Sequence, residues 1–551
     1  MQERDAEQGP IVIADPDASE WDDASDVVVV GYGGAGANAA LQSREEGADV
    51  IVIDRFGGGG ATHYSGGIIY AGCTKYQREA GFEDTPERMY DYLVTEVGDV
   101  MRPETLRRFC EQSNADIEWL TKHGVQFSSA AYLSKTAFPP EGKFLYYPGN
   151  ETHPRNTAKT PAIPRGHRAV GKGYTGKDYF AKLSDAVSRA GVRVRRHEQA
   201  IRPVVDTAGR VIGLEVNSMP ESVRREHQRL YEKANPQQLF HNKKVERAVV
   251  EMRALEEKHG RRLRIRARSG VILATGAFCF DADMVAEADP TYGKYYRYLH
   301  RFAVPGNDSS GIAFARALGG ATAHLDTFYL GRIISPPEAF IQGTIVNNKG
   351  ERFVNEDAYA SKLGLAIIRQ PDGEAWLILP AGGLRRALRQ SIFTSWSMIK
   401  NFGLFAVITI LFGGNKRAGD LRTLAEKCGI DADGLERTVR EHDEALEVGL
   451  PDAVGKLDDY RTPLGDGPYS AVRMSIDNPV AFNPFLTLGG LTVDEETGMV
   501  TRADGSGIEG LYAAGLCAVG LHSAGYISGL GLADGVFSGR RAARSIAARM
   551  K

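Results

Sequence analysis

The sequence predicts an α/β fold in which a parallel-sheet domain is interrupted by an inserted α+β domain. Three observations support this prediction. A strand, a glycine turn, a helix and a second strand follow one another within residues 26–54. Two later apolar runs, at 269–276 and 510–515, each end in a glycine turn. From about residue 327 to 470 the glycine-bounded strands give way to mixed segments, and a chain of 551 residues is long enough for two domains.

The first element is a βαβ unit with the sequence DVVVVGYGGAGANAALQSREEGADVIVID. Gly31, Gly33 and Gly36 form a G-x-G-x-x-G motif, which permits a tight turn, close approach of the backbone to a pyrophosphate, and helix-on-strand packing. Asp54 ends the second strand at the spacing where a carboxylate accepts hydrogen bonds from ribose hydroxyls. These residues predict a Rossmann-like domain of the glutathione-reductase type that binds FAD or NAD.

The glycine-rich stretch at 57–67 favours FAD over NAD. A flavin dinucleotide is held by backbone amides from several loops, and segments poor in side chains permit that close approach. The apolar runs at 269–276 and 510–515 each return the chain to the same cofactor. FAD is therefore the expected cofactor.

The same patterns divide the chain into segments. Residues 1–25 form an N-terminal extension, residues 26–326 and 471–551 form two parts of the FAD-binding domain, and residues 327–470 form the inserted domain. A segment at about 218–260 is dominated by Glu, Lys, Arg and Gln with sparse apolar residues at helical spacing, which predicts a helical insertion. We expect a solvated helical hairpin there, with a partner-binding surface as the alternative.

Composition narrows the classes of function. A net charge of −3 spread along the chain offers no basic surface, so nucleic-acid binding is not expected. The five cysteines lack C-x-x-C spacing and the histidines lack metal-ligand spacing, so no metal site is expected. The acidic N-terminus does not resemble a secretory signal, which leads us to expect a cytoplasmic location.

One apolar stretch lies inside the inserted domain, within residues 385–417, and basic residues flank it. The stretch is too short to span a bilayer, which takes about 20 apolar residues. Two interpretations stay open: a buried helix of the inserted domain, or a peripheral membrane contact in which the cations meet anionic headgroups.

The motifs at both ends of the chain resemble the FAD-binding domain of the fumarate reductase and 3-ketosteroid dehydrogenase flavoprotein family. The resemblance implies an extended FAD with its pyrophosphate at Gly31 to Gly36, and an inserted domain that caps the flavin and contributes to catalysis. His63 is misplaced for the covalent flavin link of some relatives, so we expect non-covalent FAD. The motifs and the resemblance together assign cofactor contacts to Gly31, Gly33, Gly34, Ala35, Gly36, Asp54, Arg55, Gly60, Ala61, Thr62, Ser65, Gly66, Gly67, Ala274, Thr275, Gly276, Gly515, Gly531 and Leu532.

The chain departs from the fumarate reductases where those enzymes hold a dicarboxylate. Their His-Thr before a double glycine is replaced by Phe485-Leu486-Thr487-Leu488, and their Asn-Arg-Leu-Gly-Gly by Tyr526-Ile527-Ser528-Gly529-Leu530. Their proton-delivering arginine is replaced within Asp357-Ala358-Tyr359. A dicarboxylate would be left unpaired among these groups, so an uncharged, largely apolar substrate is expected.

The pattern that fits resembles the 3-ketosteroid dehydrogenases, especially the Δ4-(5α) type, at Tyr526-x-Ser528-Gly529 and at Phe353-x-Asn355-Glu356-Asp357-x-Tyr359. The resemblance implies, position by position, that Tyr526 binds the substrate carbonyl, that Ser528 lies beside the acidic carbon, and that Tyr329 is the opposing active-site tyrosine. The resemblance implies a 3-ketosteroid substrate and an unidentified electron acceptor or donor.

The chemistry explains why hydroxyl groups suffice for such a reaction. Desaturation next to a ketone removes the α hydrogen as a proton and the β hydrogen as hydride onto flavin N5. The Tyr526 hydroxyl and backbone N–H groups at the start of the following helix can polarise the carbonyl. A hydroxyl is a poor base at neutral pH, and the base stays open between Ser528 and Tyr329. An ene-reductase for another apolar enone, and a flavoprotein that senses a ligand without turnover, are the alternative functions.

Overall fold

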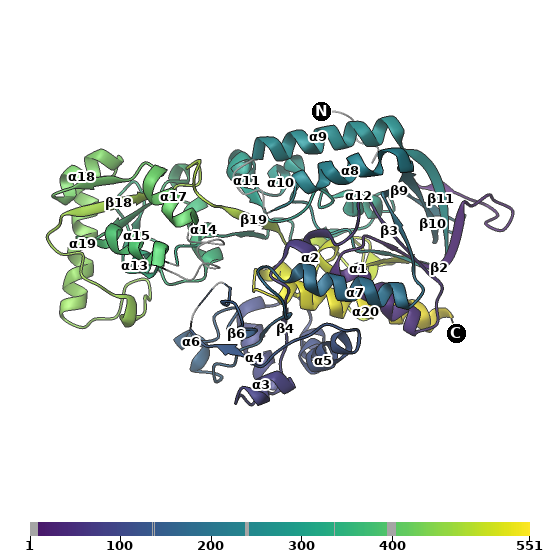
Figure 1. The fold of residues 1–551 in the computed structure, drawn as a ribbon, viewed down its shortest axis with the longest axis horizontal. Coiled ribbons are helices and arrows are strands. Elements are labelled where there is room, and N and C mark those ends of the chain that lie inside the picture. The colour runs from purple at the N-terminus through teal and green to yellow at the C-terminus, as the bar shows by residue number, and fades with distance from the viewer. Residues whose placement is uncertain are drawn as a thin grey trace. The chain divides into compact units, whose positions relative to one another are not determined.

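The computed structural model describes residues 9–134, 136, 138–236, 242–335, 337–393 and 404–550. The chain divides into two compact units (Figure 1). Unit 1 comprises Met1–Ala288, Arg301–Phe328 and Leu486–Lys551, and unit 2 comprises Asp289–His300 and Tyr329–Phe485. Each unit has its own sheet and its own buried core, and each is described separately below.

The main sheet of unit 1 is built on five parallel strands in the order β22, β11, β2, β3 and β8. The valines of β2 (Asp23–Val30) pair with β3 (Val50–Asp54) on one side and with β11 (Arg261–Leu273) on the other. Val27 to Val30 are at most 4% exposed, because helices and neighbouring strands enclose a parallel sheet on both faces. This burial explains why the strand is a continuous apolar run.

Strand β11 has two different halves. Its arginine-rich first half pairs antiparallel with β10 (Val211–Ser218), which pairs with β9 (Glu198–Val205). Its apolar second half is parallel to β2 and to β22 (Gly507–Ala513). The apolar runs predicted at 269–276 and 510–515 are therefore confirmed as neighbouring strands.

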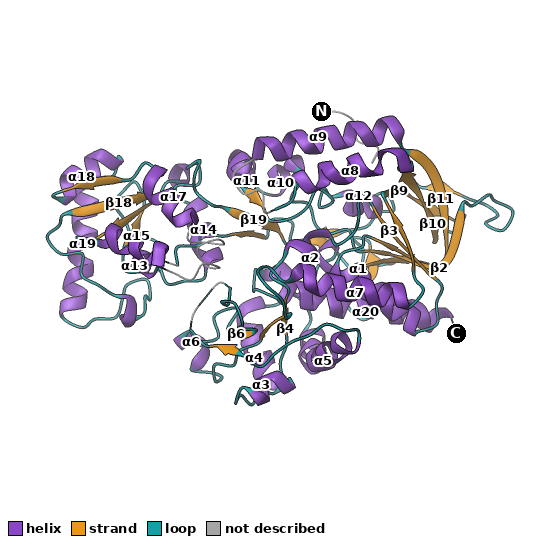
Figure 2. Cartoon of the chain, viewed as in Figure 1, coloured by secondary structure: helices purple, strands orange, loops and turns teal. Residues whose placement is uncertain are grey.

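Helices cover the sheet of unit 1, as Figures 1 and 2 show. The predicted small-residue helix is α1 (Gly34–Glu45), and it packs along α20 (Leu530–Met550), the last helix of the chain. Gly539 permits this close packing, since a Cβ there would lie 2.7 Å from the Ala35 carbonyl oxygen. The last helix of the chain thus packs beside the glycine motif.

The charged segment predicted as a helical insertion consists of two helices, α8 (Glu221–Lys233) and α9 (Asn242–His259). They pack on each other and lie side by side in Figure 1. Their outer faces carry exposed charges, but their inner faces are buried. The solvated hairpin that the charge pattern predicts is thus solvated on one side only.

The remaining elements of unit 1 are short strands and peripheral helices. They are β1 (Ile11–Val12), α2 (Gly60–Tyr64), β4 (Ile68–Tyr70), α3 (Lys75–Glu79), α4 (Pro86–Val97), α5 (Pro103–Lys122), β5 (Ala131–Tyr132), β6 (Leu145–Tyr146), α6 (Pro154–Thr157), β7 (Gly166–Arg168), α7 (Gly176–Arg189), β8 (Arg193–Arg196), α10 (Ala282–Ala288), α12 (Ser310–Arg316), β13 (Thr322–Ala323), β20 (Gly490–Leu491), β21 (Met499–Thr501), η6 (Gly515–Cys517) and η7 (Leu521–Ala524).

Unit 2 is an α+β unit around a four-stranded sheet in the order β15, β16, β18 and β17. Its elements are α11 (Pro290–Tyr295), η2 (Tyr296–Tyr298), α13 (Glu338–Ile341), β15 (Thr344–Val346), α14 (Ala360–Ile368), η3 (Pro371–Gly373), β16 (Trp376–Leu379), α15 (Gly383–Phe393), α17 (Leu404–Phe412), β17 (Lys416–Ala418), α18 (Leu421–Cys428), α19 (Ala432–Glu447), η5 (Asp458–Tyr460) and β18 (Tyr469–Arg473). The chain first crosses between the units from Ala288 to Asp289, and it crosses again within β12 (His300–Arg301), β14 (Phe328–Leu330) and β19 (Pro484–Thr487).

The bounds of unit 2 differ from the sequence-based segment 327–470. Strand β18 is an inner strand of the unit 2 sheet, so this unit continues through Phe485 rather than ending at 470. Asp289–His300 also belongs to unit 2, where the His300 N–H donates to the Asn483 carbonyl at 2.8 Å and Tyr292 packs on Phe485. These contacts are long-range in sequence, which is why local patterns do not reveal them.

Three further findings concern the apolar segments and the cysteines. In the described ranges, no helix is long and apolar enough to cross a membrane. Of the apolar stretch within 385–417, residues 394–403 lie outside the described residues. All five cysteines are free thiols, and Cys73 alone among them is only partly buried.

Candidate active site

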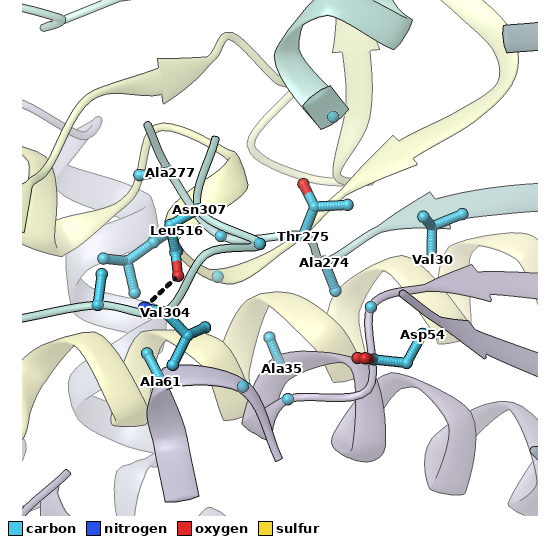
Figure 3. Close-up of a pocket in the computed structure, with 18 of the residues that line it drawn as sticks. Val30, Ala35, Asp54, Ala61, Ala274, Thr275, Ala277, Val304, Asn307 and Leu516 are labelled. Carbon is cyan, nitrogen blue, oxygen red and sulfur yellow. Dashed lines mark hydrogen bonds between the residues drawn. The ribbon is translucent and has the colours of Figure 1, made fainter. Parts of the chain in front are cut away.

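A long groove in unit 1 runs along the carboxyl ends of the parallel strands (Figure 3). It encloses about 1200 Å³, part of which is open to solvent. Ligands of open α/β sheets bind at these strand ends, which is where the sequence places its glycine turns. The predicted contact residues that line the groove are Gly31, Gly33, Gly34, Ala35, Asp54, Arg55, Gly60, Ala61, Thr62, Ala274, Thr275, Gly276, Gly515, Gly531 and Leu532.

Helix α1 points its N-terminus into this groove. Gly33 is the N-cap, its first turn holds no acidic residue, and the Gly34 N–H donates to the Thr62 hydroxyl at 3.0 Å. A Cβ added at Gly33, Gly60 or Gly531 would come no nearer than 3.5 Å to the atoms around it and would stand in the groove. These three glycines leave a cradle for a phosphate at a helix N-terminus, where unpaired N–H groups and the helix dipole favour an anion.

Gly31 and Gly36 have packing roles. A Cβ at Gly36 would lie 1.9 Å from the Gly31 carbonyl oxygen, and one at Gly31 would lie 2.5 Å from the Ala274 carbonyl oxygen. Gly31 also has a φ of 100°, in the left-handed region that favours glycine. Gly36 does not line the groove, which agrees with the helix-on-strand packing expected for the third glycine of the motif.

Asp54 lies at the end of β3, as predicted. Its carboxylate oxygens accept N–H donors of Tyr32 and Phe56, both at 2.7 Å. Burial raises the pKa of Asp54 and these hydrogen bonds counteract the rise. Gly58 also donates a backbone hydrogen bond to this carboxylate, but a carboxylate has about four acceptor sites, so Asp54 can still accept a hydroxyl donor from a ribose.

Besides Gly36, three predicted contacts do not line the groove: Ser65, Gly66 and Gly67. They form the turn that leads from α2 to β4, in which the Thr175 hydroxyl donates to the Gly66 carbonyl at 2.9 Å. Gly67 has a φ of 65°, and a Cβ there would meet Thr175 backbone at 2.6 Å. The glycine richness of this stretch therefore has a local steric cause at its C-terminal end.

The groove also has lining residues that the sequence analysis missed. They come from β9, from the loop before α12, and from β19, and include Glu198, Gln199, Ala200, Val304, Asn307, Leu486 and Thr487. Asn307 is buried, and its side-chain oxygen accepts the Val304 N–H at 3.2 Å (Figure 3). Strand β9 and the loop before α12 carry no glycine motif, so only the topology brings them to the groove.

Two of the predicted catalytic residues lie together in unit 1. Tyr526 and Ser528 occupy the loop between η7 and α20, and their hydroxyls share a hydrogen bond that opposes the burial-induced rise of the pKa of Tyr526. Ser528 also accepts a hydrogen bond from the Tyr146 hydroxyl at 3.1 Å. The predicted pair is thus part of a chain of three hydroxyls.

Glycine fixes this loop in place. Gly529 has a φ of 89°, its carbonyl accepts the Tyr70 N–H at 3.2 Å, and a Cβ there would meet Ile68 at 2.7 Å. Immediately after it, Gly531 and Leu532 in the first turn of α20 line the groove. The loop that carries Tyr526 and Ser528 therefore leads directly into the first turn of α20, which lines the groove.

A buried carboxyl group lies near these hydroxyls. Glu151 is 2% exposed, and its Oε2 accepts the Gly149 N–H at 2.8 Å while its Oε1 has no hydrogen-bond partner within the described chain. Burial raises the pKa of Glu151 to about 7. A Cβ added at Gly149 would touch Ile527 at 3.4 Å, so this acid borders the loop that carries Tyr526 and Ser528.

The third predicted catalytic residue, Tyr329, lies in unit 2 on β14. It is 8% exposed. A Cβ at Gly331 would come within 2.5 Å of its hydroxyl oxygen, so Gly331 leaves the space that this hydroxyl occupies.

No group of three acidic, histidine or cysteine side chains that could hold a metal ion occurs in the part of the chain that is described. The groove instead suits an extended dinucleotide. It combines a helix N-terminus for the pyrophosphate, an acid at the next strand end for the ribose, and backbone from β11 and β22 along its length.

Comparisons with known proteins agree with this geometry. A family model described as "FAD binding domain" matches residues 26–532. A 3-oxo-5-alpha-steroid 4-dehydrogenase from Comamonas testosteroni is 34% identical over 514 residues, which cover 92% of this chain and 94% of that protein. A fumarate reductase (cytochrome) from Shewanella frigidimarina is 25% identical over 545 residues, covering 96% of this chain and 78% of that protein.

A solved structure agrees as well. The 3-ketosteroid Δ4-(5α)-dehydrogenase from Rhodococcus jostii, in complex with 4-androstene-3,17-dione, matches with a TM-score of 0.79 and 28% sequence identity. The match covers 98% of this chain and 100% of that chain. The chain therefore belongs to the FAD-dependent oxidoreductase family that includes the 3-ketosteroid dehydrogenases and the fumarate reductases.

Proposed function

We propose that this protein is an FAD-dependent dehydrogenase of 3-oxo-5α-steroids that introduces a double bond between C4 and C5. The observation that carries the proposal is the hydroxyl chain Tyr526, Ser528 and Tyr146 beside the start of α20, whose first residues line the FAD groove. The relative from Comamonas testosteroni and the steroid-bound structure from Rhodococcus jostii support the substrate class.

In this proposal the protein prepares the ketone for loss of a proton. Tyr526 donates a hydrogen bond to the C3 carbonyl oxygen, and first-turn N–H groups of α20 add to it, because the first N–H groups of a helix have no partner within the helix. Negative charge that develops on the oxygen is stabilised by these donors and by the helix dipole. The C4 hydrogen becomes acidic as a result.

Ser528 is the hydroxyl that we assign to the C4 proton. A serine alone is a poor base, but its oxygen is hydrogen-bonded to the Tyr146 and Tyr526 hydroxyls, so a proton taken from C4 can pass along the chain. Bound FAD supplies the two-electron acceptor for the hydride lost from C5. The steroid thereby loses two hydrogens, one as a proton and one as hydride.

We further propose that unit 1 is the FAD-binding domain and that unit 2 is the substrate domain, with Tyr329 as its catalytic contribution. FAD is held without a covalent bond, since His63 is exposed and does not line the groove. Precipitation with acid would release all of the flavin into solution if this assignment is correct, whereas yellow precipitate would contradict it.

The test is an anaerobic reaction of the holoenzyme with 3-oxo-5α-androstane steroids, followed by the absorbance of oxidised flavin and by mass spectrometry. We expect bleaching and loss of two hydrogens at C4 and C5. Tyr526→Phe and Ser528→Ala should retain FAD but slow bleaching about 10²-fold or more. Tyr90→Phe is the matched control, because Tyr90 of α4 stacks under Arg107 of α5 and belongs to neither the groove nor the hydroxyl chain.

The same assay separates the alternatives. A flavin that is not bleached by the saturated steroid, but is reoxidised from its reduced form by an enone, would indicate an ene-reductase. A change in the flavin spectrum without any product would indicate a sensor. Either result would overturn the proposed dehydrogenase.

We also propose a peripheral membrane contact at the end of α17. Leu411 and Phe412 are 59% and 71% exposed, and the nearby Lys416 and Arg417 are exposed as well. Apolar side chains next to cations suit the boundary of an anionic bilayer. Sedimentation with phosphatidylglycerol vesicles should fall in Leu411→Ser/Phe412→Ser but not in Val448→Ser, which removes another exposed apolar side chain of unit 2. Equal sedimentation of the parent, the double variant and Val448→Ser would contradict the membrane contact.

A further inference from the structure

The α8–α9 hairpin is inserted between two paired strands of unit 1. Strands β10 and β11 are antiparallel, and their ends meet where Ser218 pairs with Arg261. The chain leaves the sheet after Ser218 and returns at Arg261, so the sheet would be complete without the hairpin. The contacts of the hairpin with the rest of unit 1 therefore indicate its function.

Its inner face packs on the loop that follows Asp54. The Tyr231 ring stacks on Phe56 with 4.3 Å between ring centroids, and Leu230, Met252 and Val304 complete a buried cluster. Phe56, Tyr231 and Val304 all line the groove. One helix of the hairpin thus contributes directly to the wall of the cofactor site.

A buried ion pair fastens the same loop. The Arg55 guanidinium donates two hydrogen bonds to Glu256 of α9, both at 2.7 Å, and a third to Asp308 at 2.6 Å. The side chains of Arg55, Glu256 and Asp308 are 11%, 7% and 9% exposed. Burial alone would raise the pKa of Glu256, but the charge of Arg55 holds it at about 2, so the pair is ionised.

A chain of histidines extends this network to a second wall of the groove. Because Glu256 is an acceptor, the His227 Nε2 at 2.8 Å from it carries the proton. The other ring nitrogen of His227, Nδ1, shares a hydrogen bond with the Nδ1 of His197 at 3.0 Å. The backbone N–H of His197 donates to the Phe56 carbonyl. The residues that follow His197, Glu198 to Ala200, line the groove.

The hairpin therefore holds three segments that meet at the Asp54 end of the groove: 54–57, 197–200 and 303–308. We propose that the α8–α9 hairpin is an element that retains the cofactor, and that Glu256 and Tyr231 are the residues through which it slows the dissociation of FAD. This inference rests on FAD binding and not on the identity of the steroid. It assigns a function to a segment whose outer surface has only the charges typical of a solvated helix.

The test measures FAD dissociation from the holoenzyme without any steroid. Holoenzyme is diluted into FAD-free buffer, and the rise in flavin fluorescence reports release. Glu256→Gln removes the charge that pairs with Arg55 while keeping the shape, and Tyr231→Leu removes the stacked ring while keeping an apolar side chain. Glu226→Gln is the matched control, because Glu226 lies on the outer face of α8 in an exposed pair with Arg229.

We expect FAD release to be at least 10-fold faster in Glu256→Gln and in Tyr231→Leu, and within twofold of the parent in Glu226→Gln. Thermal midpoints of the FAD-loaded and FAD-free proteins give a second readout, and the gap between them should narrow in the first two variants. Release within twofold of the parent, an equal increase in all three variants, or an equal fall of both midpoints would overturn the proposal. Because steroid is absent, these results are independent of the proposed dehydrogenase activity.

Discussion

The buried acid Glu151 gives a prediction whose size follows from its surroundings. Its pKa is raised from 4.5 to about 7 in the folded protein, because burial disfavours the charged form. The difference of 7 − 4.5, about 2.5, corresponds to roughly 3 kcal/mol at 1.36 kcal/mol for each pKa unit. Glu151→Gln keeps an acceptor for the Gly149 N–H and removes the titration.

The sign follows from proton linkage. Between pH 4.5 and 7 the folded protein binds a proton at Glu151 that the unfolded chain has released, so the free energy of unfolding falls as pH rises through this window. The stabilisation is fully present below about pH 4.5 and is lost above about pH 7. The variant does not titrate at this position, so its free energy of unfolding rises relative to that of the parent by about 3 kcal/mol across that pH range.

The assay is thermal unfolding of the holoenzyme at pH 5 and pH 8. With roughly 2.1 cal/mol/K of unfolding entropy per residue, a chain of 551 residues has about 1.2 kcal/mol/K, so 3 kcal/mol corresponds to about 3 °C. We expect the midpoint of Glu151→Gln, relative to the parent, to be about 3 °C higher at pH 8 than at pH 5. Glu111→Gln, at an exposed position of α5, controls for loss of a charge. A difference that is the same at both pH values would refute the burial of an unpaired carboxyl.

Two further predictions address each unit separately. Gly36→Ala should leave the protein with less than a tenth of the FAD content of the parent, because its Cβ would lie 1.9 Å from the Gly31 carbonyl oxygen and the backbone of the motif must move. The control Gly419→Ala should retain FAD, since no atom lies within 4 Å of the added Cβ. Full FAD content in Gly36→Ala would contradict the packing role of Gly36. Arg352→Met should destabilise unit 2 by about 3–5 kcal/mol in denaturant titrations, since Arg352 is 8% exposed on its side chain and is bonded to Glu356 and Asp452. The exposed Arg422, which pairs with Asp433 and Glu436, provides the comparison: Arg422→Gln should leave the denaturant midpoint almost unchanged, and an equal effect of both substitutions would count against a buried ion cluster.

Much of the cofactor site could be predicted because its requirements are local in sequence. A glycine is needed wherever the backbone adopts a positive φ or approaches another strand, and Gly31 and Gly36 meet those conditions within one βαβ unit. Asp54 follows from the end of the second strand. The hydroxyls Tyr526 and Ser528 are predicted from short motifs, and the structure adds the hydrogen bond from Tyr146 to Ser528, which joins residues 382 positions apart.

Other features could not be predicted from local patterns. The groove walls at Gln199 and Asn307 come from segments that have no motif and reach the groove only in the folded protein. The charged segment 218–260 has the composition of a solvated hairpin, and its ion pair between Glu256 and Arg55 joins residues 201 positions apart. Charge alone does not reveal which side of such a helix is buried, because the partner of each charge lies elsewhere in the chain.

The sequence by itself determined the βαβ unit, the FAD cofactor and the family, because each depends on motifs whose residues lie within a few turns or strands of one another. Only the tertiary structure decided that unit 2 includes Asp289–His300 and continues to Phe485, that Glu151 is a buried acid, and that the α8–α9 hairpin lines the groove. The physical reason is that burial and ion pairing depend on which distant segments pack together, and a linear pattern of residues does not specify that packing.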